Sequence, residues 1–433
     1  MSQADRTFDP VETLPRPELE ALQEQRLLAL LPYAFERSGL VRETWQAAGV
    51  HPREIRSLAD FRERVPFVDK DAIRRYRDRH GDPYGGVLCV DPGELTAVMS
   101  TSGTTGDPTL VAERWEGEVS GGLGLARDFW EIGVRPGDYL TCMLFTFRGP
   151  FFAQFTAIGA APVFFDHHPD EFRRWCEASL ALRPTAQYTL SGPLVAALQQ
   201  LEPRLPFDLK DVFSSYRGIV FAGEPLGRAA RRKAEEWGIK FHLQTSLGDV
   251  GAATECREHD GCHAWEDTAL VEHLEPEGAA PVADGERGEL VVTSLANHTM
   301  PLVRYRSDDL VRLTRRRCGC GRTHARIWPL GRKGDEVLVA GRGILPVDVW
   351  EAVEAIPETS AGLFQIIRTQ RECDALRLRV GFAGEGAPPR GLAERVAASV
   401  FQRVGVEPRV ELVPQGELLR LGPPHKIPRV AKQ

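Results

Sequence analysis

Two short stretches of the sequence carry residues suited to metal binding. Six residues separate Cys256 from His263, and a single glycine separates Cys318 from Cys320. Thiolate sulfur and imidazole nitrogen are the donors of closed tetrahedral zinc sites. The two pairs can hold one ion only if the fold brings them together, and Cys262 is an alternative ligand to His263. The spacing predicts a structural zinc site, because four protein ligands leave no position for water. Unrelated thiols near a strand end are the alternative.

A third stretch, STSGTTGDPTLV from Ser100 to Val111, suits an anionic ligand. Its glycines, serines and threonines offer backbone N–H groups and hydroxyls that can surround a phosphate. It lacks the GK[ST] ending of a Walker A loop, contains no Lys or Arg, and carries the negative charge of Asp107. If it holds a polyphosphate, the positive charge must come from elsewhere. An ordinary turn is the alternative for this stretch taken alone.

The elements around these stretches alternate between β-rich and helical segments. The pattern predicts a helix from Pro17 over residues 17–31 and β-rich runs at 95–100, 139–145, 161–166, 218–223 and 239–244. This alternation indicates an α/β body. A strand pair is predicted within 285–313. After Gly331 the pattern changes to a small α+β unit of about a hundred residues, a typical domain size.

Composition limits the classes of partner. The chain has 433 residues and a formal net charge of −7, with 54 basic and 61 acidic side chains, so no broad basic surface for nucleic acid is expected. The N-terminus has no apolar signal region and no segment is a convincing membrane span. Eight cysteines in such a chain suggest a reducing compartment. We therefore expect a cytoplasmic protein that binds small molecules, with no nucleic-acid or membrane partner.

Four further motifs follow the Ser100–Val111 stretch in a fixed order: AGEPLG (222–227), YRSDDL (305–310), GRKGDEV (331–337) and LGPPHKIPRV (421–430). This ordered set resembles the adenylate-forming superfamily of acyl-CoA synthetases, and the chain is most similar to its phenylacetate-CoA ligase family, nearly end to end. The resemblance implies a large N-terminal body of several α/β subdomains, residues 1–333. It also implies a small, mobile α+β C-terminal lid, residues 334–433, hinged near Gly334 and Asp335.

The resemblance also implies an ATP site. The residues that would wrap the phosphates are Thr101, Ser102, Gly103, Thr104, Thr105 and Gly106. The adenine pocket would be lined by Ala222, Gly223, Glu224 and Pro225. Asp309 would accept hydrogen bonds from the ribose hydroxyls, and Arg332 would lie near ribose and phosphate. Lys426 matches the catalytic lysine of the lid, which would bring the missing positive charge.

One motif departs from the family pattern. The family places an aromatic residue for adenine and a glutamate for Mg²⁺ where this chain reads QTSLGDVG (244–251). Gln244 stands at the aromatic position and Gly248 at the glutamate position, so the neighbouring Asp249 is the candidate Mg²⁺ ligand. Candidate acid-binding residues are Phe147, Arg148, Phe151 and Gln244.

The expected activity is ATP-dependent conversion of an aromatic or arylalkyl carboxylic acid to an acyl-adenylate, followed by transfer to CoA. Two alternatives stay open. The acceptor could be an amine, a hydroxyl or a carrier-protein thiol, because Ala340 stands where related enzymes often carry Arg. The chain could also bind nucleotide without turnover, as Gln244 and Gly248 suggest. The oligomeric state is open, with a homodimer as one option.

Overall fold

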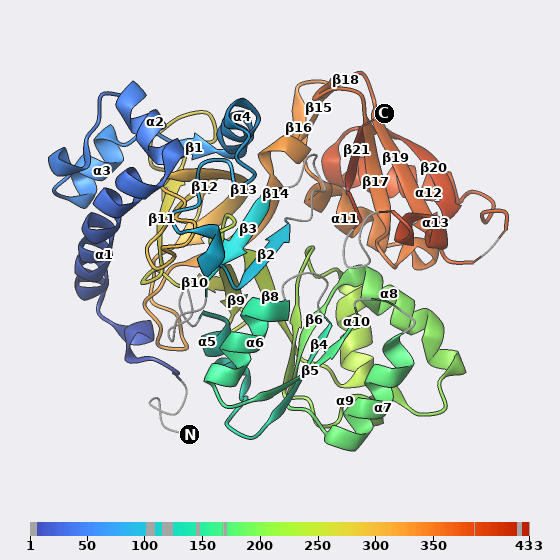
Figure 1. Cartoon of the computed structure of the whole chain (residues 1–433). Helices are drawn as coiled ribbons and strands as arrows, with labels where there is room; N and C mark the ends of the chain where they lie inside the picture. Colours follow the sequence, from blue (N-terminus) through green and yellow to red (C-terminus); the bar gives the residue numbers. More distant parts are fainter. Residues whose placement is uncertain are drawn as a thin grey trace. The chain divides into compact units, whose positions relative to one another are not determined.

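The computed structural model describes residues 7–100, 109–114, 124–143, 148–166, 168, 171–384, 386–421 and 427–432. The chain, coloured along its sequence in Figure 1, forms two compact units. Unit 1 comprises Met1–Asp138, Thr146–Pro162 and Gln244–Pro329. Unit 2 comprises Tyr139–Phe145, Val163–Leu243 and Leu330–Gln433. Each unit combines separate stretches of sequence, and residues 330–433 belong to the same unit as residues 163–243. The predicted boundary between a body at 1–333 and a mobile lid at 334–433 therefore stays a prediction.

Helices form the N-terminal part of unit 1. They are α1 (Arg16–Arg37), α2 (Gly39–Ala47), α3 (Leu58–Arg64), α4 (Lys70–His80), α5 (Gly124–Ile132) and α6 (Arg148–Ala157). The helix predicted at 17–31 is α1, which Figure 1 shows in dark blue. Its Leu27 and Leu31 share one buried cluster with Trp45 of α2 and Phe61 of α3. Removal of these large apolar side chains from water stabilises the packing of the three helices.

The sheet of unit 1 is largely antiparallel. Its strands follow the order β11 (Ala269–Leu274), β12 (Arg287–Ser294), β13 (Tyr305–Thr314), β14 (Arg326–Arg332), β10 (Cys262–Ala264) and β9 (Ala252–Glu255). β1 (Val68–Asp69) pairs with β13, and β2 (Ala97–Ser100) pairs with β3 (Leu110–Glu113) in a separate sheet. The antiparallel pairing of β12 with β13 confirms the strand pair predicted within 285–313.

Unit 2 contains a parallel sheet covered by helices. Its strands follow the order β8 (Phe241–Ser246), β7 (Gly218–Phe221), β6 (Ala186–Leu190), β4 (Tyr139–Met143) and β5 (Ala161–Phe165). Its helices are α7 (Phe172–Leu182), α8 (Gly192–Leu201), α9 (Leu209–Phe213) and α10 (Arg228–Trp237). Trp175, Phe213 and Trp237 belong to its core. The pairing of β4, β6, β7 and β8 confirms the predicted α/β body, since parallel strands need helical crossovers.

The C-terminal part of unit 2 is the α+β unit expected after Gly331. One sheet has the order β20 (Pro408–Pro414), β19 (Leu376–Phe382), β17 (Phe364–Arg368) and β21 (Val430–Lys432). A second has the order β16 (Arg342–Ile344), β15 (Val337–Val339) and β18 (Glu372–Cys373). The helices are α11 (Pro346–Glu354), α12 (Leu392–Val404) and α13 (Gln415–Leu419). Among all described helices, none is long and apolar enough to cross a membrane.

Candidate functional site

The four predicted metal ligands lie together in unit 1. The ligand atoms of Cys256, His263, Cys318 and Cys320 are all within 4.8 Å of one another. The Cys256 and Cys318 sulfurs are 3.7 Å apart, and the Cys320 sulfur is 3.5 Å from Nε2 of His263. Two sulfur ligands at about 2.3 Å from a tetrahedral metal are about 3.8 Å apart. The four donors therefore fit a zinc ion.

Strand pairing brings the two halves of this cluster together. β10, which contains His263, pairs with β9 on one side and with β14 on the other. Cys256 follows β9, and the Cys318–Cys320 pair lies in the turn before β14. Cys262 is the neighbour of His263 in β10, so its side chain points to the opposite face of the strand. The structure thus selects His263 rather than Cys262 as the fourth donor.

The surroundings of Cys320 favour its metal-binding form. A hydrogen bond with Cys256 lowers the pKa of the Cys320 thiol, and the imidazole of His263 lowers it further, against the opposing effect of burial. The thiolate is the form that binds metal. The same hydrogen bond raises the pKa of the Cys256 thiol, so Cys320 is the cysteine whose thiolate form the surroundings favour.

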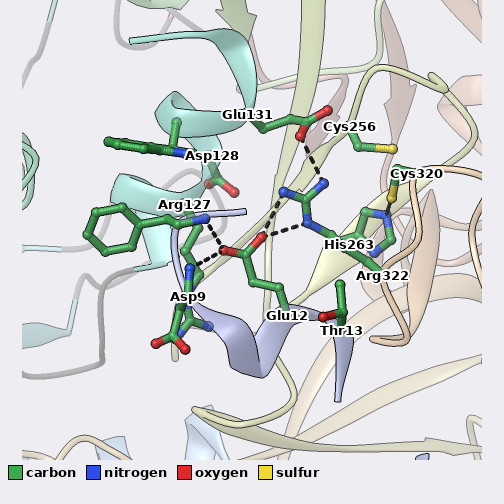
Figure 2. A network of polar contacts seen from close by, with 12 residues as sticks. Asp9, Glu12, Thr13, Arg127, Asp128, Glu131, Cys256, His263, Cys320 and Arg322 are labelled. Carbon is green, nitrogen blue, oxygen red and sulfur yellow. Dashed lines mark hydrogen bonds and ion pairs between the residues drawn. The ribbon is translucent and has the colours of Figure 1, made fainter. Parts of the chain in front are cut away.

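A buried arginine lies beside the metal-binding cluster (Figure 2). Nε of Arg322 donates to Oε2 of Glu12 at 2.9 Å, and its Nη1 donates to Oε2 of Glu131 at 3.0 Å. Burial alone would lower the pKa of Arg322, but the two carboxylates raise it overall. The Arg322 side chain is 1% exposed, so these carboxylates stabilise its charge in place of solvent.

Glu12 in turn organises the N-terminal segment. Its Oε1 accepts hydrogen bonds from the backbone N–H groups of Phe8 (2.8 Å) and Asp9 (2.9 Å). The residue after Arg322, Thr323, donates its hydroxyl to the carbonyl of Leu14 at 2.6 Å. The start of the chain is therefore tied to the residues that follow the cysteine pair. No local sequence signal pointed to this ion-pair network, since 310 positions separate Glu12 from Arg322.

Asp309 lies in an irregular part of β13. The β12–β13 register shifts between Glu289 and Val291, so three residues, 307–309, stand opposite the single position 290. The backbone of Asp308 has φ 62°, and the N–H of Asp309 donates to the hydroxyl of Ser307 at 3.1 Å. Bulges of this kind redirect side chains and are common beside active sites.

The 244–251 stretch lies next to this bulge. Gly248 has φ 56°, and a Cβ built there would lie 2.8 Å from Cγ2 of Val292 and 3.0 Å from Cβ of Ser307. A glutamate at this position would therefore clash, which accounts for the glycine. Asp249 follows with φ 60°; its Oδ2 accepts from the Tyr305 hydroxyl at 3.2 Å and lies 3.5 Å from Nζ of Lys70. The Asp249 carboxylate is therefore partly exposed and lies next to the positive charge of Lys70.

Gln244 is held by a buried hydrogen-bond chain. Its Nε2 donates to the hydroxyl of Thr254 at 3.1 Å, and that hydroxyl donates to Oδ2 of Asp128 at 2.8 Å. The indole N–H of Trp265 donates to the other carboxyl oxygen of Asp128 at 3.2 Å. Burial raises the pKa of Asp128 to about 7. Sequence reasoning missed this residue, and the sequence of α5 gives no distinct signal for it, because the same helix also contains Arg127 and Glu131.

The predicted nucleotide residues of unit 2 form a tight turn after β7. The N–H of Ala222 donates to the carbonyl of Leu190 at 3.0 Å, and Gly223 has φ 97°, a conformation that glycine adopts without strain. The side chain of Glu224 is 3% exposed. Arg332 ends β14 directly before Lys333–Asp335, the short 3-10 helix that contains both predicted hinge residues.

Some predicted site residues lie outside the described part of the chain. These are Thr101, Ser102, Gly103, Thr104, Thr105, Gly106, Phe147 and Lys426. Arg148 and Phe151 belong to α6, for which only the backbone is described at these positions. Their roles remain predictions.

Comparison with known proteins places these features in a family. No family model matches the chain. The phenylacetate-CoA ligase of Thermus thermophilus is 31% identical over 95% of this chain and 96% of its own length. The enzyme of the same name from Escherichia coli is 29% identical over 86% of this chain and 84% of its own.

A solved structure of a 2-hydroxyisobutyryl-CoA ligase in the postadenylation state, in complex with 2-HIB-AMP, is 27% identical. It covers 99% of this chain and 92% of its own, with a TM-score of 0.83. The same ligase with 2-HIB-AMP and CoA in the thioesterification state gives a TM-score of 0.67, at 27% identity over 99% of this chain and 92% of its own. The identity shared with the Thermus enzyme extends over nearly the whole of both chains, and this chain therefore belongs to the phenylacetate-CoA ligase family of AMP-forming, adenylate-forming CoA ligases.

Proposed function

We propose that this enzyme activates an aromatic or arylalkyl carboxylic acid with ATP and transfers the acyl group to CoA. The observation that carries the choice of acid is the 31% identity to a phenylacetate-CoA ligase over nearly the full length of both proteins. Three further relatives with the same name, at 28–29% identity, support it.

The reaction has two steps. A carboxylate oxygen attacks the α-phosphorus of ATP; a new P–O bond forms and the bond to the pyrophosphate oxygen breaks. The sulfur of CoA then attacks the acyl carbonyl; a C–S bond forms, the C–O bond to AMP breaks, and the thiol proton passes to solvent. The protein contributes positioning and charge stabilisation rather than a covalent intermediate.

Individual residues take the following roles in this proposal. Asp309 accepts hydrogen bonds from the ribose hydroxyls, and the bulge in β13 supports this role because it fixes the backbone at that residue. Arg332 supplies positive charge near ribose and phosphate. The 222–225 turn lines the adenine pocket, and the 101–106 segment wraps the phosphates. Lys426 supplies the positive charge that this segment lacks.

Two other groups complete the ATP and acid sites. Asp249 would hold Mg²⁺ in place of the family's glutamate, for which Val292 and Ser307 leave no room at position 248. Nζ of Lys70 lies 3.5 Å from the same carboxylate. Carboxylate oxygen is a ligand type that Mg²⁺ prefers. Phe147, Arg148, Phe151 and Gln244 line the acid pocket, and the Thr254–Asp128 chain fixes the orientation of the Gln244 amide.

The structural zinc site is also part of this proposal. Cys256, His263, Cys318 and Cys320 would hold the ion with four protein ligands, so its contribution would be to stability rather than to the reaction.

Movement of the 334–433 segment about Gly334 and Asp335 separates the two steps. The Arg368 guanidinium of β17 contacts the carbonyl of Gly334 and donates to that of Glu336 at 2.9 Å, so residues 334–336 are tied to the segment that would move.

The direct test is product analysis. Purified protein is incubated with ATP, Mg²⁺, a panel of aryl and aliphatic acids, and either CoA or an amine, and products are identified by mass spectrometry. We expect AMP, pyrophosphate and an aryl-CoA thioester. Amide or ester products would show that the acyl acceptor is an amine or a hydroxyl rather than CoA. Failure of every acid to support pyrophosphate exchange would favour a non-catalytic nucleotide-binding protein.

Replacement of Asp309 tests the nucleotide assignment. Asp309→Ala removes two acceptors of charge-assisted hydrogen bonds, each worth about 1.5–3 kcal/mol, so ATP affinity should fall at least about tenfold. Isothermal titration calorimetry of ATP binding measures the change. The matched control is Asp308→Asn in the same bulge, since asparagine tolerates the positive φ of that position. Unchanged ATP binding by folded Asp309→Ala would show that the YRSDDL motif is misassigned.

A further inference from the structure

A buried ion pair connects the 222–225 turn to the residue directly before β21, in unit 2. Nη2 of Arg429 lies 2.7 Å from Oε2 of Glu224, and the two side chains are 8% and 3% exposed. The guanidinium carbon stacks 3.7 Å from the ring centroid of Trp350. Nη1 of the same arginine donates to the carbonyl of Gly362 at 2.6 Å. Arg429 thus joins three parts of unit 2 through a single guanidinium.

A second contact lies beside this pair. Oε2 of Glu354, in α11, accepts a hydrogen bond from the N–H of Arg228 at 2.6 Å, at the first residue of α10. A carboxylate is favourable there because the N-terminal N–H groups of a helix lack partners within it. Gly227 permits the approach, since a Cβ there would lie 1.8 Å from Oε1 of Glu354. The 222–228 stretch therefore meets the C-terminal segment at two charged positions.

The 427–432 segment, in which Arg429 directly precedes β21, is itself firmly anchored. Ile427 is 1% exposed and shares a buried cluster with Leu363, Val413 and Leu418. The N–H of Ile366 donates to the carbonyl of Arg429 at 2.7 Å, and Val430 is the β21 partner of Ile366. Residues on both sides of Arg429 are therefore held by buried contacts and strand pairing, and Lys426 directly precedes this segment in the sequence.

We infer that Arg429 is a positioning residue for adenylate formation, whose ion pair with Glu224 holds the 427–432 segment against the nucleotide-binding turn. This inference rests on the proposed function, because it takes residues 222–225 as the adenine turn and Lys426 as the catalytic lysine. The pair joins residues on opposite sides of the predicted hinge. It must therefore form for the first step and open when the C-terminal segment rotates for CoA transfer.

The physical consequence is an asymmetry between the two steps. Loss of either partner leaves the other charge buried without its counterion, which disfavours the conformation that contains the pair. A conformation in which both groups reach water is not penalised. Substitution of Arg429 should therefore slow adenylate formation while leaving acyl transfer unaffected.

The test measures each step separately in Arg429→Gln, Glu224→Gln, the double variant and Arg429→Lys. We expect acid-dependent pyrophosphate exchange to fall about tenfold to a hundredfold in both single variants, the range that coupled neighbours produce. The double variant should be no slower than the slower single variant, and Arg429→Lys should recover part of the rate. In Arg429→Gln and Arg429→Lys, transfer from a supplied acyl-adenylate to CoA should stay within about twofold of wild type, the scale of surface substitutions.

The matched control is Arg395→Gln, which breaks an Arg–Glu pair with Glu358 (2.7 Å) that lies wholly within the 334–433 segment. Neither step should change in this variant. Equal loss of both steps, faster exchange in the Gln variants, or additive effects in the double variant would overturn the inference. Glu224→Gln guards against misfolding, since it keeps every contact of Arg429 with Gly362 and Trp350.

Hydrogen exchange separates this inference from the proposed function. Peptides that span 222–228 should exchange faster in Arg429→Gln than in wild type, in the absence of any substrate. If hydrogen exchange in the 222–228 peptides rises but the wild-type protein activates no acid, the role of the ion pair is supported and the proposed function fails. If hydrogen exchange in these peptides is unchanged, Arg429 does not hold the 222–225 turn. The inference then fails, whether or not the wild-type protein activates an acid.

Discussion

Cys320→Ser should remove zinc from the purified protein and lower its thermal stability. Wild-type protein prepared without chelators should contain about one zinc per chain, because the donor separations of 3.5 and 3.7 Å match a tetrahedral ion. A metal at a thousand times its Kd stabilises the folded state by about 4 kcal/mol, and this contribution disappears with the site. Elemental analysis and thermal melting measure the two effects.

The loss of stability in Cys320→Ser should extend to the N-terminal segment. Arg322 follows the cysteine pair and holds Glu12, so displacement of the 318–320 turn disturbs the ion pairs drawn in Figure 2. Limited proteolysis should therefore cut near residues 8–14 sooner in Cys320→Ser. Cys262→Ser is the matched control, because its buried thiol lies next to His263 in sequence but outside the cluster. Wild-type protein without zinc would remove the site from the proposal.

Much of the fold was predictable because its signals are local. The runs at 139–145, 161–166 and 218–223 became β4, β5 and β7, since short apolar runs between helical stretches are typical of buried parallel strands. Predicted and observed boundaries differ by a few residues. The division into units was not predictable, because β8 continues from unit 2 into unit 1 without any break in its sequence pattern.

The metal-binding residues were predictable as types, but their meeting depends on strand order. Nothing in the sequence states that β10 lies between β9 and β14, and this arrangement alone unites the two pairs. The choice of His263 over Cys262 likewise follows from the alternation of side chains in β10.

Long-range electrostatic partners are the features that sequence reasoning missed. Arg322, Glu12 and Asp128 are charged or ionisable groups in positions that only the fold makes buried. Gly248 shows the reverse case. Its departure from the family pattern looks like lost function in the sequence, whereas the structure gives it a steric cause in Val292 and Ser307.

Lys426→Ala should abolish most adenylate formation while sparing acyl transfer. The Ser100–Val111 stretch contains no basic residue, so the positive charge that stabilises the α-phosphate in the transition state must come from another segment. Loss of one preorganised group of this kind costs about a hundredfold to a thousandfold in rate. Pyrophosphate exchange, and transfer from a supplied acyl-adenylate to CoA, measure the two steps in the same preparation.

The control distinguishes this role from a general effect of charge. Lys210→Ala removes an exposed lysine from α9 and should leave both steps unchanged. If Lys426 acts as proposed, Lys426→Ala slows adenylate formation more than Arg429→Gln does. The reason is that Lys426 would contact the reacting phosphate, whereas Arg429 only positions the segment that follows Lys426. Near-normal pyrophosphate exchange in Lys426→Ala would mean that Lys426 does not supply the positive charge at the α-phosphate. The countercharge would then have to come from Arg332 or Mg²⁺ at Asp249, and Arg332→Ala would become the variant to measure.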